Sequence, residues 1–234
     1  MKNIYKLITV IIFTLLSVGS VFAADITADE LVYDSQTKTV SATGNVVIND
    51  GESTITGASG KYDFNDKTAI LSGGVNYTKN QDTLSCEILY IYSDKTINGK
   101  GNVELDFKSE NIFLSGDEIS YNQNTGIGQI NGNGYFKSQD GIIRAPQIEG
   151  HLKDVLITAS GGVEITAYTQ NVHATGNELI YTKSGTYGTD GKLVLKGNAV
   201  ATQNGNRFEG PELIFKEEEK VIETNGRSTM TINL

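Results

Sequence analysis

Apolar positions recur along this chain with a period of about 30 residues, from residue 26 to the C-terminal region. Each copy can be aligned on one anchor residue, with an apolar residue two positions earlier in six of seven copies and a small residue five positions earlier. The anchors are Tyr33, Tyr62, Tyr90, Tyr121, Gly150, Tyr181 and Phe215. Such a regular pattern indicates a fold that is built from repeats.

The spacing of two residues between the apolar positions is typical of β-strands, where alternate side chains share a face. Further apolar residues seven positions before several anchors, such as Ile26 and Ile55, extend the same stripe. We therefore predict one apolar face, and the candidate ligand-binding residues are those that best define it. They are Ile26, Leu31, Tyr33, Ile88, Tyr90, Ile119, Tyr121, Ile148, Leu179, Tyr181, Leu213 and Phe215.

A small residue and a glycine mark two further columns of the repeat. The apolar residues seven and two positions before the anchor are five residues apart, which is an odd number. They can share a face only if the alternation of side chains along the strand breaks between them, beside the small residue. A glycine follows eleven residues after six of the anchors, and the sixth repeat delays its glycine to Gly197 through an insertion around 187–191. The small-residue column predicts a bulge or a corner in every repeat.

The pattern predicts an all-β protein of about seven repeats, in which each unit contributes short strands with one apolar face. A single unit cannot bury that face, but stacked units bury a continuous apolar interior. We predict a repeat-built sandwich or roll that fills residues 24–234 as one domain, with open sheet edges at its ends.

The N-terminus has the pattern of a secretory signal peptide over residues 1–23. Lys2 and Lys6 precede an apolar stretch that ends in Val21-Phe22-Ala23. The alternative is an uncleaved anchor helix, for which the stretch is short. Cys86 is the single cysteine, which excludes a disulfide framework, and we expect it to be buried.

The remaining composition argues against an enzyme, a metal protein and a nucleic-acid-binding protein. Removal of the signal peptide leaves 17 basic residues against 28 acidic ones, a charge unsuited to nucleic acid. His151 and His173 lie in different repeats without metal-ligand or catalytic spacing, and no nucleophile or phosphate-binding motif is present. We expect no catalytic residues, no metal and no cofactor.

The recurring motif, a small residue followed by x-x-L-x-Y and later by G-N-V, resembles the OstA-like family of lipopolysaccharide-export proteins, which includes LptA. Residues 28–34 followed by 43–48 carry it best, and residues 176–181 and 101–103 repeat its two halves. The resemblance covers the mature chain. It implies an open β-jelly roll that lies in the periplasm and holds lipopolysaccharide acyl chains on an apolar groove. It also implies head-to-tail oligomers and partners among the export components of the inner and outer membranes, with no catalytic residues.

Two other classes remain open from the sequence. One is a secreted structural or adhesive β-repeat protein, such as a parallel β-helix with a closed core, whose coils also use about 30 residues. The other is a polysaccharide-active β-helix enzyme, which would need clustered carboxylates at aligned repeat positions. If the apolar stripe closes into a dry core, the first class is favoured, and if it stays accessible, a lipid carrier is favoured.

Overall fold

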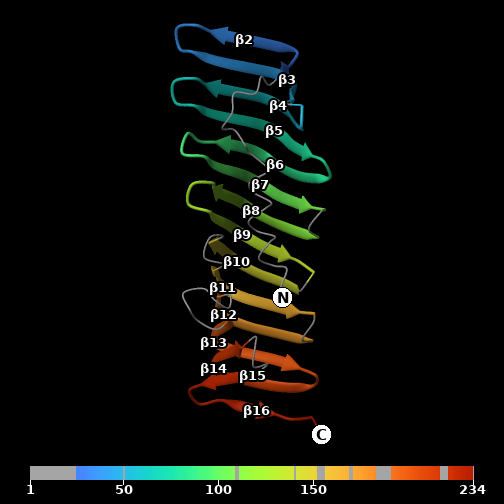
Figure 1. Cartoon of the computed structure of the whole chain (residues 1–234), viewed down its shortest axis with the longest axis vertical. Helices are drawn as coiled ribbons and strands as arrows, with labels where there is room; N and C mark the ends of the chain where they lie inside the picture. The colour runs from blue at the N-terminus through green and yellow to red at the C-terminus, as the bar shows by residue number, and fades with distance from the viewer. Residues whose placement is uncertain are drawn as a thin grey trace. The chain divides into compact units, whose positions relative to one another are not determined.

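The computed structural model describes residues 25–49, 51–108, 111–139, 141–151, 156–168, 171–182, 191–216 and 221–233. Over these residues the regular structure consists of sixteen β-strands, and neighbouring strands pair antiparallel throughout (Figure 1). The prediction of an all-β, repeat-built fold is confirmed. A parallel β-helix is wrong for this chain, because its strands alternate in direction.

The chain divides into two compact units that meet in sequence at Gly126 and Ile127. The described part of the N-terminal unit contains eight strands: β1 (Asp25–Thr27), β2 (Glu30–Asp34), β3 (Thr39–Asn49), β4 (Ser53–Asp63), β5 (Thr68–Lys79), β6 (Asp82–Ile91), β7 (Thr96–Phe107) and β8 (Ile112–Asn122). Strands β3 to β8 pair in chain order, while β1 and β2 pair with the two halves of β3.

The C-terminal unit repeats this arrangement. Its strands are β9 (Ile127–Lys137), β10 (Gly141–His151), β11 (Leu156–Ala167), β12 (Val172–Thr182), β13 (Lys192–Gln203), β14 (Asn206–Lys216), β15 (Val221–Asn225) and β16 (Thr229–Thr231). Strands β9 to β14 pair in chain order, and the short β15 and β16 pair with the two halves of β14. Among the described residues of each unit the outermost strands do not pair with each other, so each sheet is open.

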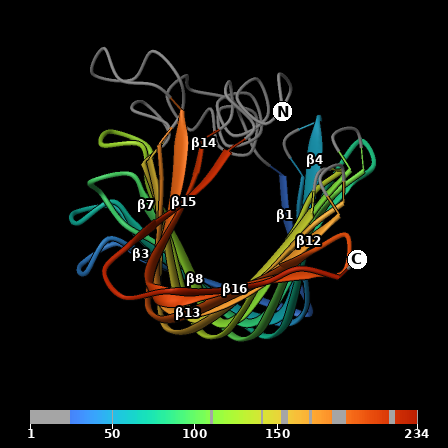
Figure 2. The same cartoon turned by 90° about the horizontal axis from the view of Figure 1, so that it is seen from below.

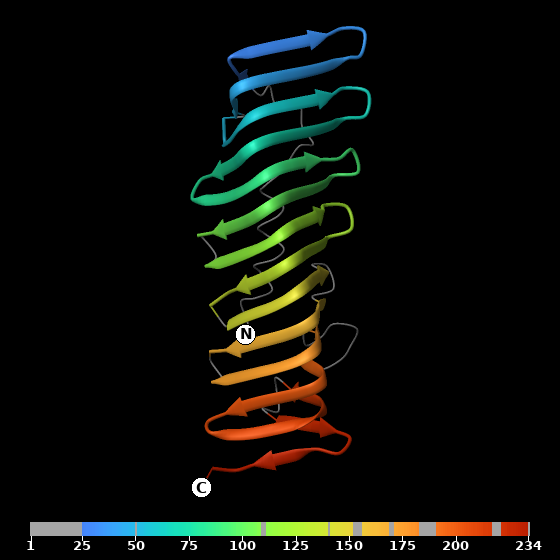
Figure 3. The same cartoon turned by 180° about the vertical axis from the view of Figure 1, so that it is seen from behind.

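Each repeat of about 30 residues is therefore a hairpin of two long strands, and each long strand bends near its middle. Figure 2 shows this bend in the strands of both units, and Figure 3 shows the turns β2–β3, β4–β5 and β6–β7 in a row along one side of the N-terminal unit. The register of every long pair shifts at the bend, as between Thr43 and Val46 of β3. The predicted corner is confirmed.

The bend lies at a pair of residues with positive φ, which is a left-handed conformation that favours Gly and Asn. The pairs are Gly44–Asn45, Gly73–Gly74, Gly101–Asn102, Gly132–Asn133, Gly161–Gly162 and Gly197–Asn198. The strand that carries the pair has one residue more than its partner across the shift, which is the pattern of a β-bulge. The glycine column of the sequence therefore marks the corner itself, and the small residue lies opposite it.

Apolar side chains lie on the inner side of the bend. A Cβ placed on Gly99, before the corner of β7, would lie 3.1 Å from Cγ1 of Val103, which follows the corner on the same strand. The two halves of the strand thus fold toward each other on this face, and a small residue leaves the room for it. Val46, Val75 and Val103 are at most 1% exposed there. We call this face the concave face and the other the convex face.

The residues before Asp25 include the predicted signal peptide, 1–23, which lies outside the described residues. Among the residues that are described, no helix is long and apolar enough to cross a membrane.

Candidate functional site

In the N-terminal unit, strand pairing places apolar side chains in rows that cross the sheet on the concave face. Residues that are opposite each other in the register share a face, so each row can be followed from strand to strand. The Ile26 row runs after the corners and contains Ile26, Ile48, Ile55, Tyr77, Leu84, Leu105 and Leu114. It is apolar at every strand.

Two rows run on the other side of the corners of this unit. The Leu31 row contains Leu31, Ala42, Gly60, Leu71, Leu89, Gly99 and Ile119. The Tyr33 row contains Tyr33, Val40, Tyr62, Ala69, Ile91, Ile97 and Tyr121. The register thus brings the predicted residues Ile26, Leu31, Tyr33, Ile119 and Tyr121 onto the concave face.

The C-terminal unit has equivalent rows. The Phe136 row contains Phe136, Ile143, Ile165, Ala174, Ala201, Phe208 and Met230. The Ile148 row contains Ile130, Ile148, Ala159, Leu179, Leu195, Leu213 and Thr224, and the Tyr181 row contains Gly128, Gly150, Ile157, Tyr181, Leu193, Phe215 and Ile222. The predicted residues Ile148, Leu179, Tyr181, Leu213 and Phe215 therefore share the concave face of this unit.

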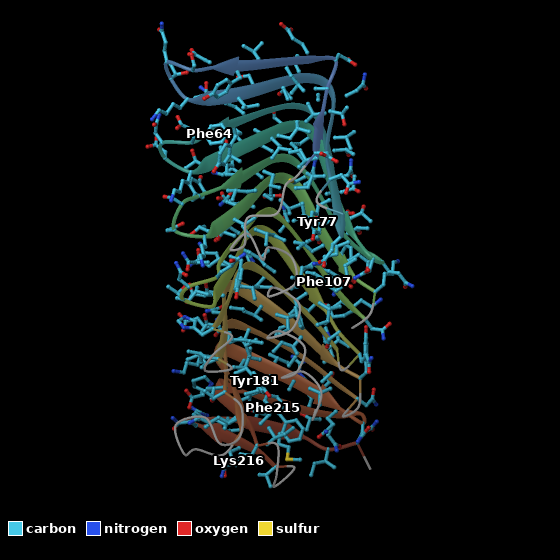
Figure 4. All side chains as sticks on the ribbon, turned by 45° about the horizontal axis from the view of Figure 1, so that its top comes forward. Phe64, Tyr77, Phe107, Tyr181, Phe215 and Lys216 are labelled. Atoms are coloured by element: carbon cyan, nitrogen blue, oxygen red, sulfur yellow. The ribbon has the colours of Figure 1, made fainter. Side chains whose placement is uncertain are left out.

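Burial on this face is deepest near the corners and weakest at the first and last strands. Leu179, Leu195 and Leu213 are at most 1% exposed, whereas Tyr33 is 63% and Met230 is 53% exposed. Figure 4 shows Tyr77 and Phe107 on the inner side of the N-terminal unit, and Tyr181 and Phe215 on the inner side of the C-terminal unit. Aromatic rings also lie at the N-terminal edge, where Phe64 contacts Tyr62 and Tyr33 edge to face.

The predicted placement of Ile88 and Tyr90 on this face is wrong. Leu89, which is 4% exposed, pairs with Leu71 and belongs to the Leu31 row. Tyr90 pairs with Ile70 and Asn98 instead, and Ile88 pairs with Ser72 and Lys100. Because alternate residues point to opposite faces, Ile88 and Tyr90 lie on the convex face.

A shorter turn between β6 and β7 accounts for this difference. Tyr33 pairs with Val40 and Tyr62 with Ala69, seven residues apart in each hairpin, but Ile91 pairs with Ile97, six residues later. Aligning this repeat on its glycine, Gly101, therefore places the anchor one residue too early, at Tyr90 instead of Ile91. The sequence did contain a signal for the missed residues Leu84, Leu89 and Ile91. With the anchor at Ile91, the residues seven and two positions earlier are the apolar Leu84 and Leu89, and the small-residue position holds Cys86.

The convex face carries the charged residues that recur near the anchors. Glu118 lies 3.3 Å from Nζ of Lys100, and Glu212 lies 3.8 Å from Nζ of Lys196. The amide of Asn98 donates to Glu118 at 2.6 Å, and this hydrogen bond lowers the pKa of the Glu118 carboxyl. These acids pair with neighbouring polar groups, as expected for a face turned to solvent.

Both histidines have a polar neighbour within hydrogen-bond distance. Nε2 of His151 lies 2.8 Å from Oε1 of Glu149, and Nδ1 of His173 lies 3.4 Å from Oγ1 of Thr166. Over the described ranges, no group of three or more His, Cys, Asp and Glu residues could hold a metal ion. Cys86 is buried, as expected, and its burial raises the pKa of the thiol to about 11.

These features define a class of protein: a repeat-built, antiparallel β-protein with a bent open sheet and an apolar concave face. Residues 54–155 match the family model described as LptA/(LptD N-terminal domain) LPS transport protein. Over this segment the chain is similar to the LptA-like family, in agreement with the resemblance seen in the repeated motif.

Among solved structures the chain is similar to LptH from Pseudomonas aeruginosa. LptH is the LptA homologous periplasmic component of the conserved lipopolysaccharide transport device in that organism. The likeness has 15% identity and a TM-score of 0.24, and covers 91% of this chain and 96% of that one. The strand pairing above, rather than this likeness, establishes the fold. No curated protein matches the sequence significantly.

Proposed function

We propose that this chain is a periplasmic component of lipopolysaccharide transport that shelters acyl chains on its concave face. The apolar rows carry the proposal, because they cross each unit without a charged residue. The match of residues 54–155 to a family of lipopolysaccharide transport proteins supports it, as does the signal-peptide pattern of the N-terminus. In this role the chain is a passive conduit, and it needs no catalytic residue.

Physical chemistry supports such a division between the two faces. Removing a methylene group from water is worth about 0.8 kcal/mol, so shelter for about ten methylenes supplies about 8 kcal/mol. The chain has a net charge of −9, and Arg144 and Arg207 pair with Glu164 and Glu209 on the convex face. The proposal therefore places the acyl chains on the concave face and leaves the phosphate-bearing headgroup in solvent.

The cargo can be tested with a pair of adjacent residues on opposite faces. Tyr121 belongs to the Tyr33 row of the concave face, and Ser120 points to the convex face. We expect Tyr121→Asp to weaken lipopolysaccharide binding by about tenfold or more, a loss of about 1.4 kcal/mol, in native mass spectrometry of the mature chain. Ser120→Asp, the matched control, should bind like the wild type. Equal binding by both variants, with both folded by circular dichroism, contradicts the proposal.

We further propose that copies of the chain assemble head to tail through their sheet edges. Among the described residues, β1 and β2 pair only with β3, while β15 and β16 pair only with β14, so each end presents a free row of backbone groups. Continuing the rows from one copy to the next would set Met230 opposite Ile26 of the second copy and Ile222 opposite Tyr33. This register keeps the concave face apolar across the junction.

That register predicts a specific cross-link. A chain with Ile26→Cys and Met230→Cys should form a ladder of disulfide-linked oligomers under mild oxidation, because opposed strand residues reach the distance that a disulfide needs. The control pair Thr27→Cys and Met230→Cys points to opposite faces and should stay monomeric. Buried Cys86 has a thiol pKa of about 11 and should not compete. If both pairs cross-link equally, or neither does, this register is wrong.

A further inference from the structure

Four side chains form an apolar and aromatic patch on the convex face of the N-terminal unit, outside the face proposed for acyl chains. We call it the Tyr90 patch, and it contains Ile70, Ile88, Tyr90 and Tyr92. Ile70 is opposite Tyr90 in the register, and Ile88 precedes Tyr90 by two residues on β6. The one-residue shift of this repeat places the patch on the convex face, so the concave rows do not account for it.

The two tyrosines form a parallel pair of rings. Their planes differ by 10° and their centroids are 6.1 Å apart. Tyr92 is 41% exposed, so one ring of the pair is open to solvent. Its backbone is held by two hydrogen bonds in the turn, because the Tyr92 amide donates to the Thr96 carbonyl at 2.8 Å and the Lys95 amide donates to the Tyr92 carbonyl at 3.0 Å. The patch is thus a positioned aromatic surface rather than a loose side chain.

Polar groups border the patch on its β7 side. Nζ of Lys100 lies 6.0 Å from the centroid of the Tyr90 ring and 3.3 Å from Glu118. Glu118 also accepts the hydrogen bond from Asn98, which is opposite Tyr90 in the register. The amide oxygen of Asn98 is buried and has no hydrogen-bond partner among the residues described.

We propose that the Tyr90 patch binds a sugar ring. The face of an aromatic ring is electron-rich, so it attracts the C–H face of a pyranose, while the Glu118 carboxylate and the Lys100 ammonium, which are 34% and 48% exposed, can bond to hydroxyl groups at the ring edge. All of these groups meet here within a small area. A free phosphate or a nucleic acid fits poorly, because Glu118 borders the patch and the chain is acidic overall.

Two sources could supply such a ring: a glycan of the cell envelope, or the saccharide part of a glycolipid. The test titrates the mature chain with two probes, the N-acetylglucosamine tetrasaccharide and a fully deacylated lipopolysaccharide oligosaccharide, and follows tyrosine side-chain resonances by NMR. We expect one probe to shift the signals of Tyr90 and Tyr92. The probe that does so identifies the source. Neither probe has acyl chains, so this outcome is separate from binding on the concave face.

Variants decide whether the patch is responsible. Tyr92→Ala should weaken binding of the active probe by about tenfold, since an aromatic contact of this kind is worth about 1 kcal/mol or slightly more. Tyr92→Phe should retain most of the affinity. Tyr168→Ala is the matched control, because Tyr168 is 46% exposed and lies in the C-terminal unit. Absence of binding by both probes at millimolar concentration, or equal losses in the Tyr92→Ala and Tyr168→Ala variants, overturns the proposal.

Discussion

The two units place apolar residues at the same positions of the repeat but distribute their volumes differently. In the N-terminal unit the Ile26 row is large throughout, with Tyr77, Leu84 and Leu105 on successive strands, whereas the Leu31 row includes Gly60 and Gly99. In the C-terminal unit the Phe136 row narrows to Ala174 and Ala201. There the Ile148 row is the large one, with Leu179, Leu195 and Leu213 on successive strands.

The difference teaches that the repeat preserves the face of each residue rather than its size. Small residues on one side of the corner accompany large residues on the other, so the space near the corner is filled in both units. Leu195 and Ala201 illustrate this on the single strand β13, where both are 0% exposed. Protein interiors are closely packed, so a smaller side chain at one position requires a larger side chain at a neighbouring position to fill the space. Substitutions on the two sides of the corner should therefore have different effects in the two units.

The largest effect is expected where the C-terminal unit relies on a large residue. Leu195→Ala should lower the free energy of unfolding by about 2–5 kcal/mol, because it removes a fully buried side chain and leaves a cavity. Leu31→Ala, on the 49% exposed edge of the equivalent row, should change it by less than about 1 kcal/mol. Urea unfolding followed by circular dichroism measures both. Similar losses for the two variants would contradict the burial gradient along the rows.

The corners offer the next test, since they are common to both units. Gly73→Ala should be more destabilising than Gly74→Ala, although both residues have positive φ. The new Cβ at Gly73 would clash with Cβ of Ala58, whereas no other atom lies within 4 Å of the Cβ position of Gly74. The left-handed conformation alone costs about 1–2 kcal/mol at either position.

In the C-terminal unit, Gly161 and Gly162 form a matched pair for this corner test. A Cβ on Gly161 would lie 2.9 Å from Cγ of Pro146, and Gly162 again has open space. The same order of stability is expected for their alanine variants in thermal unfolding. A reversed order in either unit would show that the corner tolerates side chains on its crowded side.

The proposed exchange of volumes is tested by adding bulk where the C-terminal unit is small. Ala201→Leu should destabilise the chain by about 1–3 kcal/mol, because Leu195 and its neighbours already fill the space near the corner. At the equivalent place of the N-terminal unit the natural residue is Leu105, and Leu105→Ala should cost about 2–5 kcal/mol. If Ala201→Leu stabilises the chain in urea titration, the two rows do not share a common volume.

The smallest effect concerns the turns of the N-terminal unit, which differ in whether the capping residue titrates. Oδ1 of Asp34 accepts hydrogen bonds from the backbone amides of Thr37 and Gln36, and these bonds lower the pKa of Asp34. The contribution of Asp34 is therefore complete above the ordinary Asp pKa of about 4 and is lost as the pH falls through the lower folded value.

Asn122 provides the comparison for this effect, because its Oδ1 accepts the same two backbone hydrogen bonds in the turn after β8 without titrating. Asp34→Asn should keep the cap and remove its dependence on pH. Urea midpoints measured between neutral and acidic pH should therefore fall more steeply for the wild type than for Asp34→Asn. Parallel curves would show that this turn does not contribute to acid sensitivity.

Much of the fold could be predicted from the sequence, because the repeat fixes which residues share a face. The small-residue column indicated a corner in each repeat, although the structure places the bulge itself at the glycine column on the facing strand, and ten of the twelve candidate residues lie on the concave face. Ile88 and Tyr90 were misplaced because one turn is a residue shorter, and a shift by one residue moves a side chain to the other face. The exchange of volumes between rows could not be predicted, since it depends on contacts across the corner rather than on a local pattern.

The most direct test of the account is photo-cross-linking of glycolipid from adjacent residues on opposite faces. A photoreactive amino acid is introduced at Tyr121 or Phe215 on the concave face, and at Ser120 or Ile214 on the convex face, in cells that make lipopolysaccharide. The account predicts that lipopolysaccharide is captured from Tyr121 and Phe215 and not from their neighbours. Capture from Ser120 and Ile214 alone, or from all four positions equally, would contradict the claim that the concave face carries the acyl chains.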